Sequence, residues 1–561
     1  MNCKITTAFA LAAGYGKRLK PLTDILPKPL LPVRGSSPLF MLFDKLADAG
    51  IGRIIVNTHH LAEKFDEAFA PYTANGKTVY KNAEIAKIFE PQILDTGGGI
   101  KNACALLERG TPFLVHNSDI IFTADIGRFV RAAEAKFAAD PNLAAVVCLR
   151  DKGAVKNVGV AGGFVRDMRF QTGAKVEKNM QFTGLFAANK KFLDTAKAFP
   201  ADAFSTVDVF LRLIDADPDS VAYFEENSGT WSDIGTPAEY LKACKNDPET
   251  EFSMLAKLAE FGFAAQTFAP INKGASTRKF LRFTDAEGNR LVACFYGSQK
   301  REDALYANLA RFLRANGIDV CDIVKSCGRR RIIVMTDGGE NDLLSLAKQS
   351  PYNAAPFYGR AIENLRRLHT AATESYFKKP FELSQPFDEA LYDWEQNYFK
   401  QECLISKFGI APTPELDAEL AEIKRVLLRE KPVLLHRDFQ SQNIMAELGK
   451  IKIIDFQGMR LGCALYDVAS LLFDPYVDLP DEIIQDCLRL YFRATPTPEQ
   501  LRLFYTAACE RLMQALGAYG FLSIKKGKTE YAQYFDSAIK KLSHCATLSN
   551  FPTLSNIFYD S

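Results

Sequence analysis

Apolar and polar positions divide the first 240 residues into short β-rich runs and longer stretches with helical spacing. Strands are expected where apolar residues run together before a turn, in TTAFALAAG, RIIVNTH, PFLVHNSDIIF and NLAAVVCLR. Helices are expected where apolar positions recur every three or four residues, as in SPLFMLFDKLADAG and IKNACALLERG. Their alternation predicts a mainly parallel sheet with helices on both faces and a ligand crevice at the carboxyl ends of the strands.

The polar segment KNDPETEF (245–252) separates this region from a second one with a different pattern, and is the expected domain boundary. Residues 253–345 contain two runs that resemble paired strands, KFLRFTD and RLVACFYG, then the helical REDALYANLARFLRANGI and the strand RRIIVMTDGG. Residues 346–561 are mostly helical, with one strand–turn–strand insert around LLHRDF and IKIIDFQ. The prediction is an α/β domain over 1–246 and a kinase-like α+β domain over 250–561, with a small sheet lobe and a helical lobe.

Composition narrows the possible partners. The chain has 561 residues and a net charge of +2 with both signs interspersed, so no general attraction to nucleic acid or anionic lipid is expected. No apolar run approaches the roughly 20 residues that span a bilayer. Twelve cysteines without a CxxC pair suit a reducing cytoplasm. The apolar start resembles a signal peptide, but a buried first strand is favoured because cleavage near Ala13 would destroy the loop that follows. Oligomeric state stays open.

The first candidate site is the loop LAAGYGKRLKPLTDILPKPL (11–30). Gly14 and Gly16 allow backbone N–H groups to approach phosphate oxygens closely, which a Cβ would obstruct. Arg18 and Lys28 supply cations where negative charge builds during phosphoryl or nucleotidyl transfer, and are the candidate catalytic residues. The predicted nucleotide contacts in this loop are Leu11, Ala12, Gly14 and Gly16.

Two carboxylates and a glycine run add to this site. Asp119 in HNSDII and Asp233 in WSDIGTPAEY each end an apolar strand, and two such carboxylates can jointly hold Mg²⁺. For either aspartate alone, a helix cap is the alternative. In LDTGGGIKNA (94–103), Gly97 and Gly98 permit contact with a base or ribose, unless the segment is a plain turn. His59 and His60 follow a strand and either touch the ligand or pack at the strand end.

These motifs together resemble the sugar-1-phosphate nucleotidyltransferases over the whole first 240 residues, and DTGGG, NSD and WSDIGT are most similar to N-acetylmuramate-1-phosphate uridylyltransferases. The resemblance implies that Thr183 and Gly184, in FTGLF, face the sugar. It also implies that a sugar-1-phosphate oxygen attacks the α-phosphorus of UTP in line, without a protein nucleophile. Phosphocholine cytidylyltransferases share the opening loop, but a triple glycine is not expected in their nucleotide segment.

The second candidate site is HRDFQSQN, followed by the strand IKIIDFQ. In protein kinases a catalytic-loop Asp accepts the proton of the attacking hydroxyl, while an Asn and a later Asp bind Mg²⁺. The same order predicts Asp438 as the base and Asn443 and Asp455 as metal ligands. Asp467 is expected to support the catalytic loop.

The second half resembles the aminoglycoside phosphotransferase and choline kinase superfamily, and IDFQGMRLGCALYDVASLL and RLMQALGAYGFL are similar to the anomeric kinases of N-acetylmuramate and N-acetylglucosamine. Glu395 is either an acceptor for a sugar hydroxyl or a helix-surface residue. RLVACFYG lacks the strand lysine that kinases place on the ATP phosphates. Arg278 and Lys279, beside a Gly/Ser-rich loop that could cover the phosphates, are the nearest substitutes.

The two resemblances describe consecutive reactions, since an anomeric sugar kinase makes the substrate of a sugar-1-phosphate nucleotidyltransferase. Together they imply ATP and UTP as substrates, Mg²⁺ at both sites and UDP-N-acetylmuramate as the product, in peptidoglycan recycling. The alternatives are a choline kinase with a cytidylyltransferase, a pair making a GDP-sugar, or a sugar- or nucleotide-sensing protein with decayed sites. The intact acidic residues argue against the last.

Overall fold

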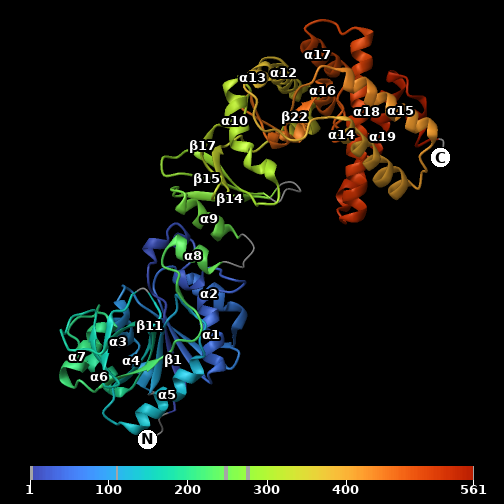
Figure 1. Cartoon of the computed structure of the whole chain (residues 1–561). Helices are drawn as coiled ribbons and strands as arrows, with labels where there is room; N and C mark the ends of the chain where they lie inside the picture. The colour runs from blue at the N-terminus through green and yellow to red at the C-terminus, as the bar shows by residue number, and fades with distance from the viewer. Residues whose placement is uncertain (1–3, 109–111, 154, 245–249, 273–277, 560–561) are drawn as a thin grey trace. The chain divides into compact units, whose positions relative to one another are not determined.

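The computed structural model describes residues 4–108, 112–153, 155–244, 250–272 and 278–559, which form two compact units (Figure 1). The first unit extends to Thr267 and the second begins at Phe268, except that residues 285–287 cluster with the first. Helix α9 (Glu251–Glu260) contacts α8 (Pro237–Ala243) and groups with the first unit, whereas the sequence analysis assigned this stretch to the second domain. Most of the KNDPETEF boundary segment lies outside the described residues.

A mixed sheet forms the centre of the first unit. In the described residues its eleven strands follow the order β3-β4-β5-β2-β1-β6-β11-β8-β12-β10-β9. Their bounds are Thr7–Leu11 (β1), Arg53–Thr58 (β2), Thr73–Ala74 (β3), Lys77–Tyr80 (β4), Ala83–Phe89 (β5), Phe113–Asn117 (β6), Ala145–Arg150 (β8), Val158–Ala161 (β9), Phe164–Met168 (β10), Lys178–Ala188 (β11) and Val221–Glu225 (β12).

Only part of this sheet is parallel, so the prediction of a mainly parallel sheet was too simple. Strands β5, β2, β1 and β6 are parallel neighbours, but the long strand β11 runs antiparallel to both β6 and β8. A small separate pairing joins β7 (Ile120–Phe122) to β13 (Trp231–Asp233), with Ile120 opposite Asp233. This pairing brings Asp119 and Asp233 to the same place, although they are far apart in the sequence.

Helices cover both faces of the sheet, as the alternating pattern predicted. Side chains alternate along β1: Ala8 and Ala10 belong to one buried cluster and Phe9 to the other. The first cluster includes residues of α1 (Pro38–Asp48), α2 (Ala62–Phe69) and α5 (Ile126–Ala139). The second includes residues of α3 (Asp95–Asn102), α4 (Cys104–Leu107), α6 (Lys190–Lys197) and α7 (Thr206–Ala216).

The second unit has a small sheet lobe whose strands follow the order β14-β15-β16-β18-β17. Their bounds are Thr267–Ile271 (β14), Lys279–Thr284 (β15), Arg290–Phe295 (β16), Ile323–Cys327 (β17) and Ile332–Thr336 (β18), with helix α10 at Tyr306–Ala315. The predicted pair KFLRFTD and RLVACFYG is confirmed, because β15 and β16 are antiparallel with Lys279 opposite Phe295.

The helical lobe contains two short antiparallel strand pairs in place of the single predicted insert, β19 with β22 and β20 with β21. These strands are Val433–Leu435 (β19), Ile444–Glu447 (β20), Lys450–Ile453 (β21) and Arg460–Gly462 (β22). The α-helices are Leu343–Gln349 (α11), Pro351–Arg367 (α12), Thr373–Lys378 (α13), Glu389–Tyr398 (α14), Pro414–Arg429 (α15), Leu465–Leu472 (α16), Asp481–Phe492 (α17), Pro498–Gly520 (α18), Phe535–Ser549 (α19) and Pro552–Asn556 (α20).

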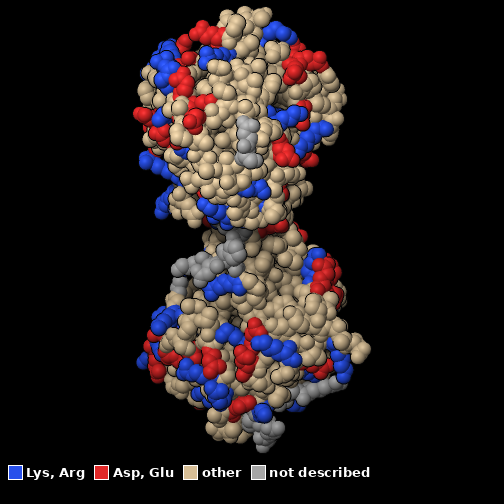
Figure 2. All heavy atoms as spheres, turned by 90° about the vertical axis from the view of Figure 1, so that its right-hand side faces the viewer, with Lys and Arg blue, Asp and Glu red and all other residues tan. Residues whose placement is uncertain are grey.

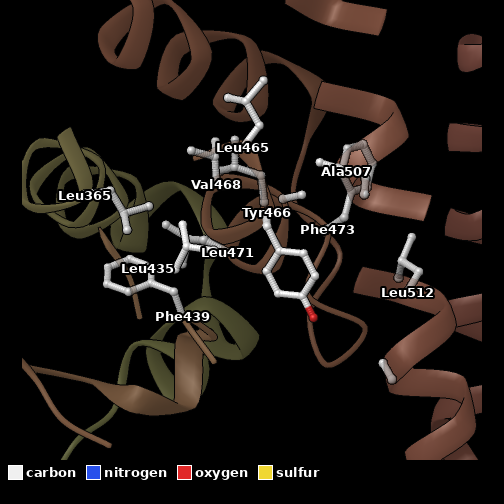
Figure 3. Close-up of a cluster of buried hydrophobic side chains, with 14 of the residues drawn as sticks. Leu365, Leu435, Phe439, Leu465, Tyr466, Val468, Leu471, Phe473, Ala507 and Leu512 are labelled. Atoms are coloured by element: carbon white, nitrogen blue, oxygen red, sulfur yellow. The ribbon is translucent and has the colours of Figure 1, made fainter. Parts of the chain in front are cut away.

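One buried cluster extends through both lobes of the second unit. Figure 3 shows the part in which Leu465, Val468 and Leu471 of α16 lie near Leu435 and Phe439. The last two residues flank the HRD segment, so burial of this core fixes the position of the second candidate site. Within the described residues, every helix is too short or too polar to cross a bilayer. Positive and negative side chains are interspersed on the face shown in Figure 2.

Candidate active sites

A cavity of about 290 Å³ lies at the end of β1 in the first unit. The residues that line it include seven of those predicted for the first site: Leu11, Ala12, Gly14, Gly16, Arg18, Lys28 and Asp119. Lys17, Pro29 and Gly235 complete the lining, and the last of these follows Asp233 by two residues. The structure therefore brings the glycine loop, its cations and the strand-end carboxylates together, at the strand edge where open α/β sheets bind ligands.

Local hydrogen bonds hold the glycine loop in place. The Ala12 N–H donates to Asn57 Oδ1 at 2.6 Å, and Asn57 Nδ2 in turn donates to Glu90 Oε1 at 2.7 Å. Gly16 has φ +61°, and a Cβ there would lie 2.7 Å from Thr23 Cγ2, so both backbone angle and space require glycine. The Thr23 carbonyl lies 2.6 Å from His60 Nε2. His60 thus supports the loop.

Lys28 connects the two carboxylates of this site. Its Nζ lies 2.7 Å from Asp119 Oδ2 and 2.8 Å from Asp233 Oδ1, and its side chain is only 9% exposed. Burial lowers the pKa of Lys28, but the charges and hydrogen bonds of the two aspartates outweigh this effect and raise it above its ordinary value. Lys28 is therefore a cation at neutral pH, and it occupies the point on which both carboxylates converge.

The same two carboxylates suit a divalent cation. Each is about one third exposed, and each forms an ion pair with Lys28. Carboxylate oxygens combined with substrate phosphates are typical Mg²⁺ ligands, so the donor set fits the predicted metal. Among the described residues, no cluster of three or more acidic, histidine or cysteine side chains offers a metal a complete set of protein ligands. A metal here would therefore depend on ligands from the substrates.

The triple glycine lies on α3, and its members differ in what they face. A Cβ on Gly97 would lie 2.5 Å from the Phe204 ring, and one on Gly98 would lie 2.0 Å from the Asp202 carbonyl oxygen. Both backbone N–H groups donate to Phe204 O, at 2.8 and 3.1 Å. Gly97 and Gly98 thus permit close packing inside the unit, and their contact with a nucleotide stays a prediction. Gly99, which the sequence analysis passed over, faces Asn57, Glu90 and Leu11.

The predicted sugar-facing residues also have internal roles. Thr183 is fully buried, and its hydroxyl donates to Cys148 O at 2.8 Å. Gly184 has φ +84° and lies where the register between β11 and β8 shifts. The Trp231 indole N–H donates to Thr183 O at 2.9 Å. The Thr183 hydroxyl therefore donates its hydrogen bond within the sheet, and contact of Thr183 and Gly184 with a sugar stays a prediction.

In the second unit, the predicted base stands beside two cations. Arg437 Nη1 lies 3.3 Å from Asp438 Oδ2, and Arg511 Nη2 lies 4.0 Å from Asp438 Oδ1. Desolvation raises the pKa of Asp438, but the charges of Arg437 and Arg511 outweigh it and hold the pKa below its ordinary value. The Asn443 amide nitrogen donates to Asp438 O at 2.8 Å. Asp438 is thus an ionised carboxylate tied to the predicted metal ligand.

Asp467 supports this loop from α16, as predicted. Its carboxylate accepts the backbone N–H of His436 at 2.6 Å and that of Arg437 at 2.9 Å. Arg437 has φ +79°, and Asp455, further along the chain, has φ +67°. A left-handed backbone at non-glycine residues is unfavourable and persists where surrounding contacts fix it, often at functional sites. One of these residues, Asp455, is a predicted metal ligand, and the other, Arg437, directly precedes the predicted base Asp438.

The neighbouring residues Arg278 and Lys279 have different surroundings in the structure. Arg278 forms an ion pair with Asp455, lies 3.7 Å from Asp303 through Nε, and donates from Nη1 to Gln457 Oε1 at 2.9 Å. Lys279 is exposed at the start of β15. Of the two, Arg278 is brought to the candidate site, on the carboxylate predicted to bind metal. Residues 273–277 of the predicted phosphate-covering loop lie outside the described residues.

Glu395 is fully buried in α14, which excludes the alternative of a helix-surface residue. Tyr466 donates to its Oε2 at 3.4 Å, and Arg437 Nη2 lies 3.9 Å from Oε1. Desolvation raises the pKa of Glu395 to about 7, although nearby arginines oppose the shift. Glu395 therefore belongs to the charged cluster around Asp438, and the sequence carried no signal for its burial.

Comparisons with known proteins agree with the two-unit description. Residues 7–250 match the family model described as "Nucleotidyl transferase", and residues 267–504 match "Phosphotransferase enzyme family". The chain is 36% identical over 131 residues to N-acetylmuramate alpha-1-phosphate uridylyltransferase of Caulobacter vibrioides, covering 23% of this chain and 51% of that protein. It is 38% identical over 118 residues to the protein of the same name from Neisseria meningitidis serogroup B, covering 21% and 48%.

A second kind of relative is a kinase. The chain is 23% identical over 300 residues to N-acetylmuramate/N-acetylglucosamine kinase of Pseudomonas aeruginosa, covering 50% of this chain and 86% of the kinase. By contrast, the chain spans only about half the length of the two uridylyltransferases that it matches. The two family matches lie in different units of the structure, one in each. The first unit therefore contains the match to the nucleotidyl transferase family and the second unit the match to the phosphotransferase enzyme family, and both are families of enzymes.

Proposed function

We propose that this chain catalyses two consecutive reactions. The second unit phosphorylates free N-acetylmuramate, N-acetylglucosamine or both at the anomeric hydroxyl with ATP. The first unit transfers UMP from UTP to the sugar 1-phosphate, which gives UDP-N-acetylmuramate for peptidoglycan recycling. The observation that carries the proposal is the presence in one chain of similarity to both a named kinase and a named uridylyltransferase, whose substrates share the same sugar.

In the kinase reaction Asp438 accepts the proton of the anomeric hydroxyl while the sugar oxygen attacks the γ-phosphorus of ATP, the bond from that phosphorus to the β,γ-bridging oxygen breaks, and ADP leaves. Its depressed pKa keeps it ionised and able to hydrogen-bond that hydroxyl at neutral pH. Asp467 holds the backbone on the N-terminal side of Asp438, and Asn443 holds its carbonyl, so the carboxylate is preorganised. Arg278, which forms an ion pair with Asp455, replaces the missing strand lysine in orienting the phosphates.

In the nucleotidyl transfer, an oxygen of the sugar 1-phosphate attacks the α-phosphorus of UTP and pyrophosphate leaves. The loop from Leu11 to Gly16 supplies backbone N–H groups to the triphosphate, because glycines leave the approach open. Arg18 and Lys28 offset the charge that accumulates on the phosphates in the transition state. No side chain forms a covalent bond to the nucleotide.

Mg²⁺ is part of the proposal at both sites, with Asp119 and Asp233 as its ligands in the first unit and Asn443 and Asp455 in the second. When bound, it would neutralise and orient the phosphate oxygens. Arg278 and Lys28 now contact carboxylates that the metal would use, so both cations are expected to shift toward the phosphates once it is present. A cytoplasmic location is also proposed, because both reactions consume nucleoside triphosphates and the described cysteines are unpaired thiols.

The test is to incubate the full chain with N-acetylmuramate or N-acetylglucosamine, ATP and MgCl₂, with UTP, CTP or GTP, and to identify products by mass spectrometry. The expected products are the sugar 1-phosphate without a second nucleotide and the UDP-sugar when UTP is present. Choline serves as a further acceptor with CTP. Formation of CDP-choline or of a GDP-sugar instead would refute the assignment, and no turnover of any acceptor would favour the sensing alternative.

A further inference from the structure

The region around Asp438 contains more positive than negative charge. Arg437 and Arg511 both lie within 4.0 Å of its carboxylate, so each has a charged partner. A third arginine, Arg460, begins β22 and pairs in register with Leu435, three residues before Asp438. Arg460 therefore reaches the same region from a neighbouring strand, although nothing in the proposed kinase chemistry uses it.

Arg460 is buried without a counter-ion. The residue is 7% exposed; its Nε donates to Gly458 O at 3.2 Å, and its guanidinium carbon lies 5.5 Å from the centre of the Phe387 ring. In the part of the chain that the structure describes, no carboxylate lies within 4.0 Å of its guanidinium nitrogens. Buried arginines are normally paired, because taking a charge out of water is costly unless hydrogen bonds replace the solvent.

Neighbouring polar atoms also lack partners. Glu395 Oε1 and Arg437 Nε are both buried without a hydrogen bond, and the Glu395 carboxyl, whose pKa is raised to about 7, neutralises the cluster only in part. Burial lowers the pKa of Arg460 and the positive charge of Arg437 lowers it further, while the charges of Glu395 and Asp438 oppose this only in part. Unsatisfied buried polar groups in a native protein call for an explanation, and a bound ligand is one.

We propose that Arg460, together with Arg437, forms a subsite for a carboxylate on the sugar that the kinase unit phosphorylates. A carboxylate would provide the missing counter-ion and accept two parallel hydrogen bonds from a guanidinium. This inference rests on the proposed function. N-acetylmuramate carries a lactyl carboxylate, whereas N-acetylglucosamine has a hydroxyl in its place. Arg460 is therefore a specificity residue that favours the acidic sugar.

An ATP phosphate is the competing anion, and the position of Arg460 argues against it. The contacts of Arg460 are with Gly458 and Phe387, both in the helical lobe. Arg278, the residue assigned to the ATP phosphates, comes from the sheet lobe and contacts Asp455. The two arginines thus serve different parts of the reaction: one faces the nucleotide and the other faces the acceptor.

The experiment measures kcat/KM of the full chain for three acceptors at saturating ATP: N-acetylmuramate, its methyl ester and N-acetylglucosamine. For Arg460→Gln, we expect kcat/KM for N-acetylmuramate to fall by about 10- to 100-fold, the scale of charged hydrogen bonds. The ester and N-acetylglucosamine should change by less than about threefold, and KM for ATP should not change. The kcat/KM of the wild-type enzyme for the methyl ester should be close to the kcat/KM of Arg460→Gln for N-acetylmuramate.

Controls separate this subsite from a general defect. Arg489→Gln, on an exposed arginine of α17, should leave all three acceptors unaffected. If Arg460→Gln unfolds, Arg460→Lys retains charge without the paired geometry and should lose part of the preference for the acid. Equal losses for the acid and both neutral acceptors, or an increased KM for ATP, would overturn the subsite while leaving the kinase function intact. No phosphorylation of any acceptor by the wild type would refute the proposed function, and the subsite with it.

Discussion

The buried carboxyl of Glu395 makes the stability of the second unit depend on pH. Its pKa is raised from an ordinary value of 4.5 to about 7, first by desolvation, with Arg437, Arg511 and Arg460 opposing. At about 1.4 kcal/mol per pH unit, the 2.5-unit difference corresponds to about 3 kcal/mol. Between pH 4.5 and 7 the unfolded chain releases this proton before the folded unit does. The Glu395 contribution to the free energy of unfolding therefore decreases as pH rises through this window.

Replacement by glutamine removes the titration and retains the shape of the side chain. Glu395→Gln should match the wild type near pH 4.5, where Glu395 is protonated, and should be more stable than it by up to about 3 kcal/mol at pH 8. Two tryptophans are present, Trp231 in the first unit and Trp394 beside Glu395. In a Trp231→Phe background, urea unfolding followed by fluorescence reports on the second unit alone.

The decisive quantity is the difference between the two unfolding free energies at pH 5, 6, 7 and 8. Glu374→Gln, on an exposed glutamate of α13, is the matched control and should change the free energy of unfolding by less than about 0.5 kcal/mol. Parallel profiles for Glu395→Gln and its parent would show that Glu395 ionises normally in the folded unit. In that case the buried cluster of arginines and carboxylates around Asp438 would not desolvate Glu395 as described.

Four further substitutions test the two sites separately. Asp438→Asn should abolish phosphorylation of the free sugar, because the base is lost, while UMP transfer to supplied sugar 1-phosphate persists. Loss of both activities would show that the two sites are not independent. Asp233→Ala should reduce UDP-sugar formation at least about a hundredfold and let the 1-phosphate accumulate, and near-normal output would make this carboxylate structural. Gly98→Ala would place a Cβ 2.0 Å from Asp202 O, so the first unit should lose about 2 kcal/mol and unfold about 5 °C earlier in calorimetry, with kinase activity unchanged. Thr183→Val should lower the free energy of unfolding of the first unit by about 1 kcal/mol, because the hydrogen bond to Cys148 O is lost. KM for the sugar phosphate should stay within about twofold, and a large rise in KM would show that the hydroxyl contacts the sugar.

The sequence predicted best what depends on local pattern. The strand β1 and its glycine loop could be placed because an apolar run, a turn and the required left-handed glycine are all contained in about twenty residues. The convergence of Asp119 and Asp233 was expected from the ends of apolar strands, but it depends on the antiparallel pairing of β7 with β13, which the sequence did not show. The HRD and DFQ spacing located Asp438, Asn443 and Asp455 before any tertiary contact was known.

The sequence could not distinguish residues whose role depends on distant packing. A glycine that admits a ligand and one that admits a neighbouring carbonyl look identical in a sequence, so the packing of Gly97 and Gly98 against residues 202–205 could not be predicted. The burial of Glu395 depends on packing between α14 and α18, two helices that are about a hundred residues apart in the sequence. Arg460 interrupts the otherwise apolar run MRLGC, but a single charged residue there does not show whether it is buried or which groups it faces.

The bridge from Lys28 to Asp119 and Asp233 has a consequence for how mutants of the first unit are interpreted. Because one ammonium contacts both carboxylates, the three side chains form a single coupled unit. Removing either aspartate also releases Lys28 toward the other, and removing Lys28 leaves two like charges facing each other. The effects of single replacements therefore cannot be summed, and the share of each residue is defined only by the coupling energies of a double-mutant cycle.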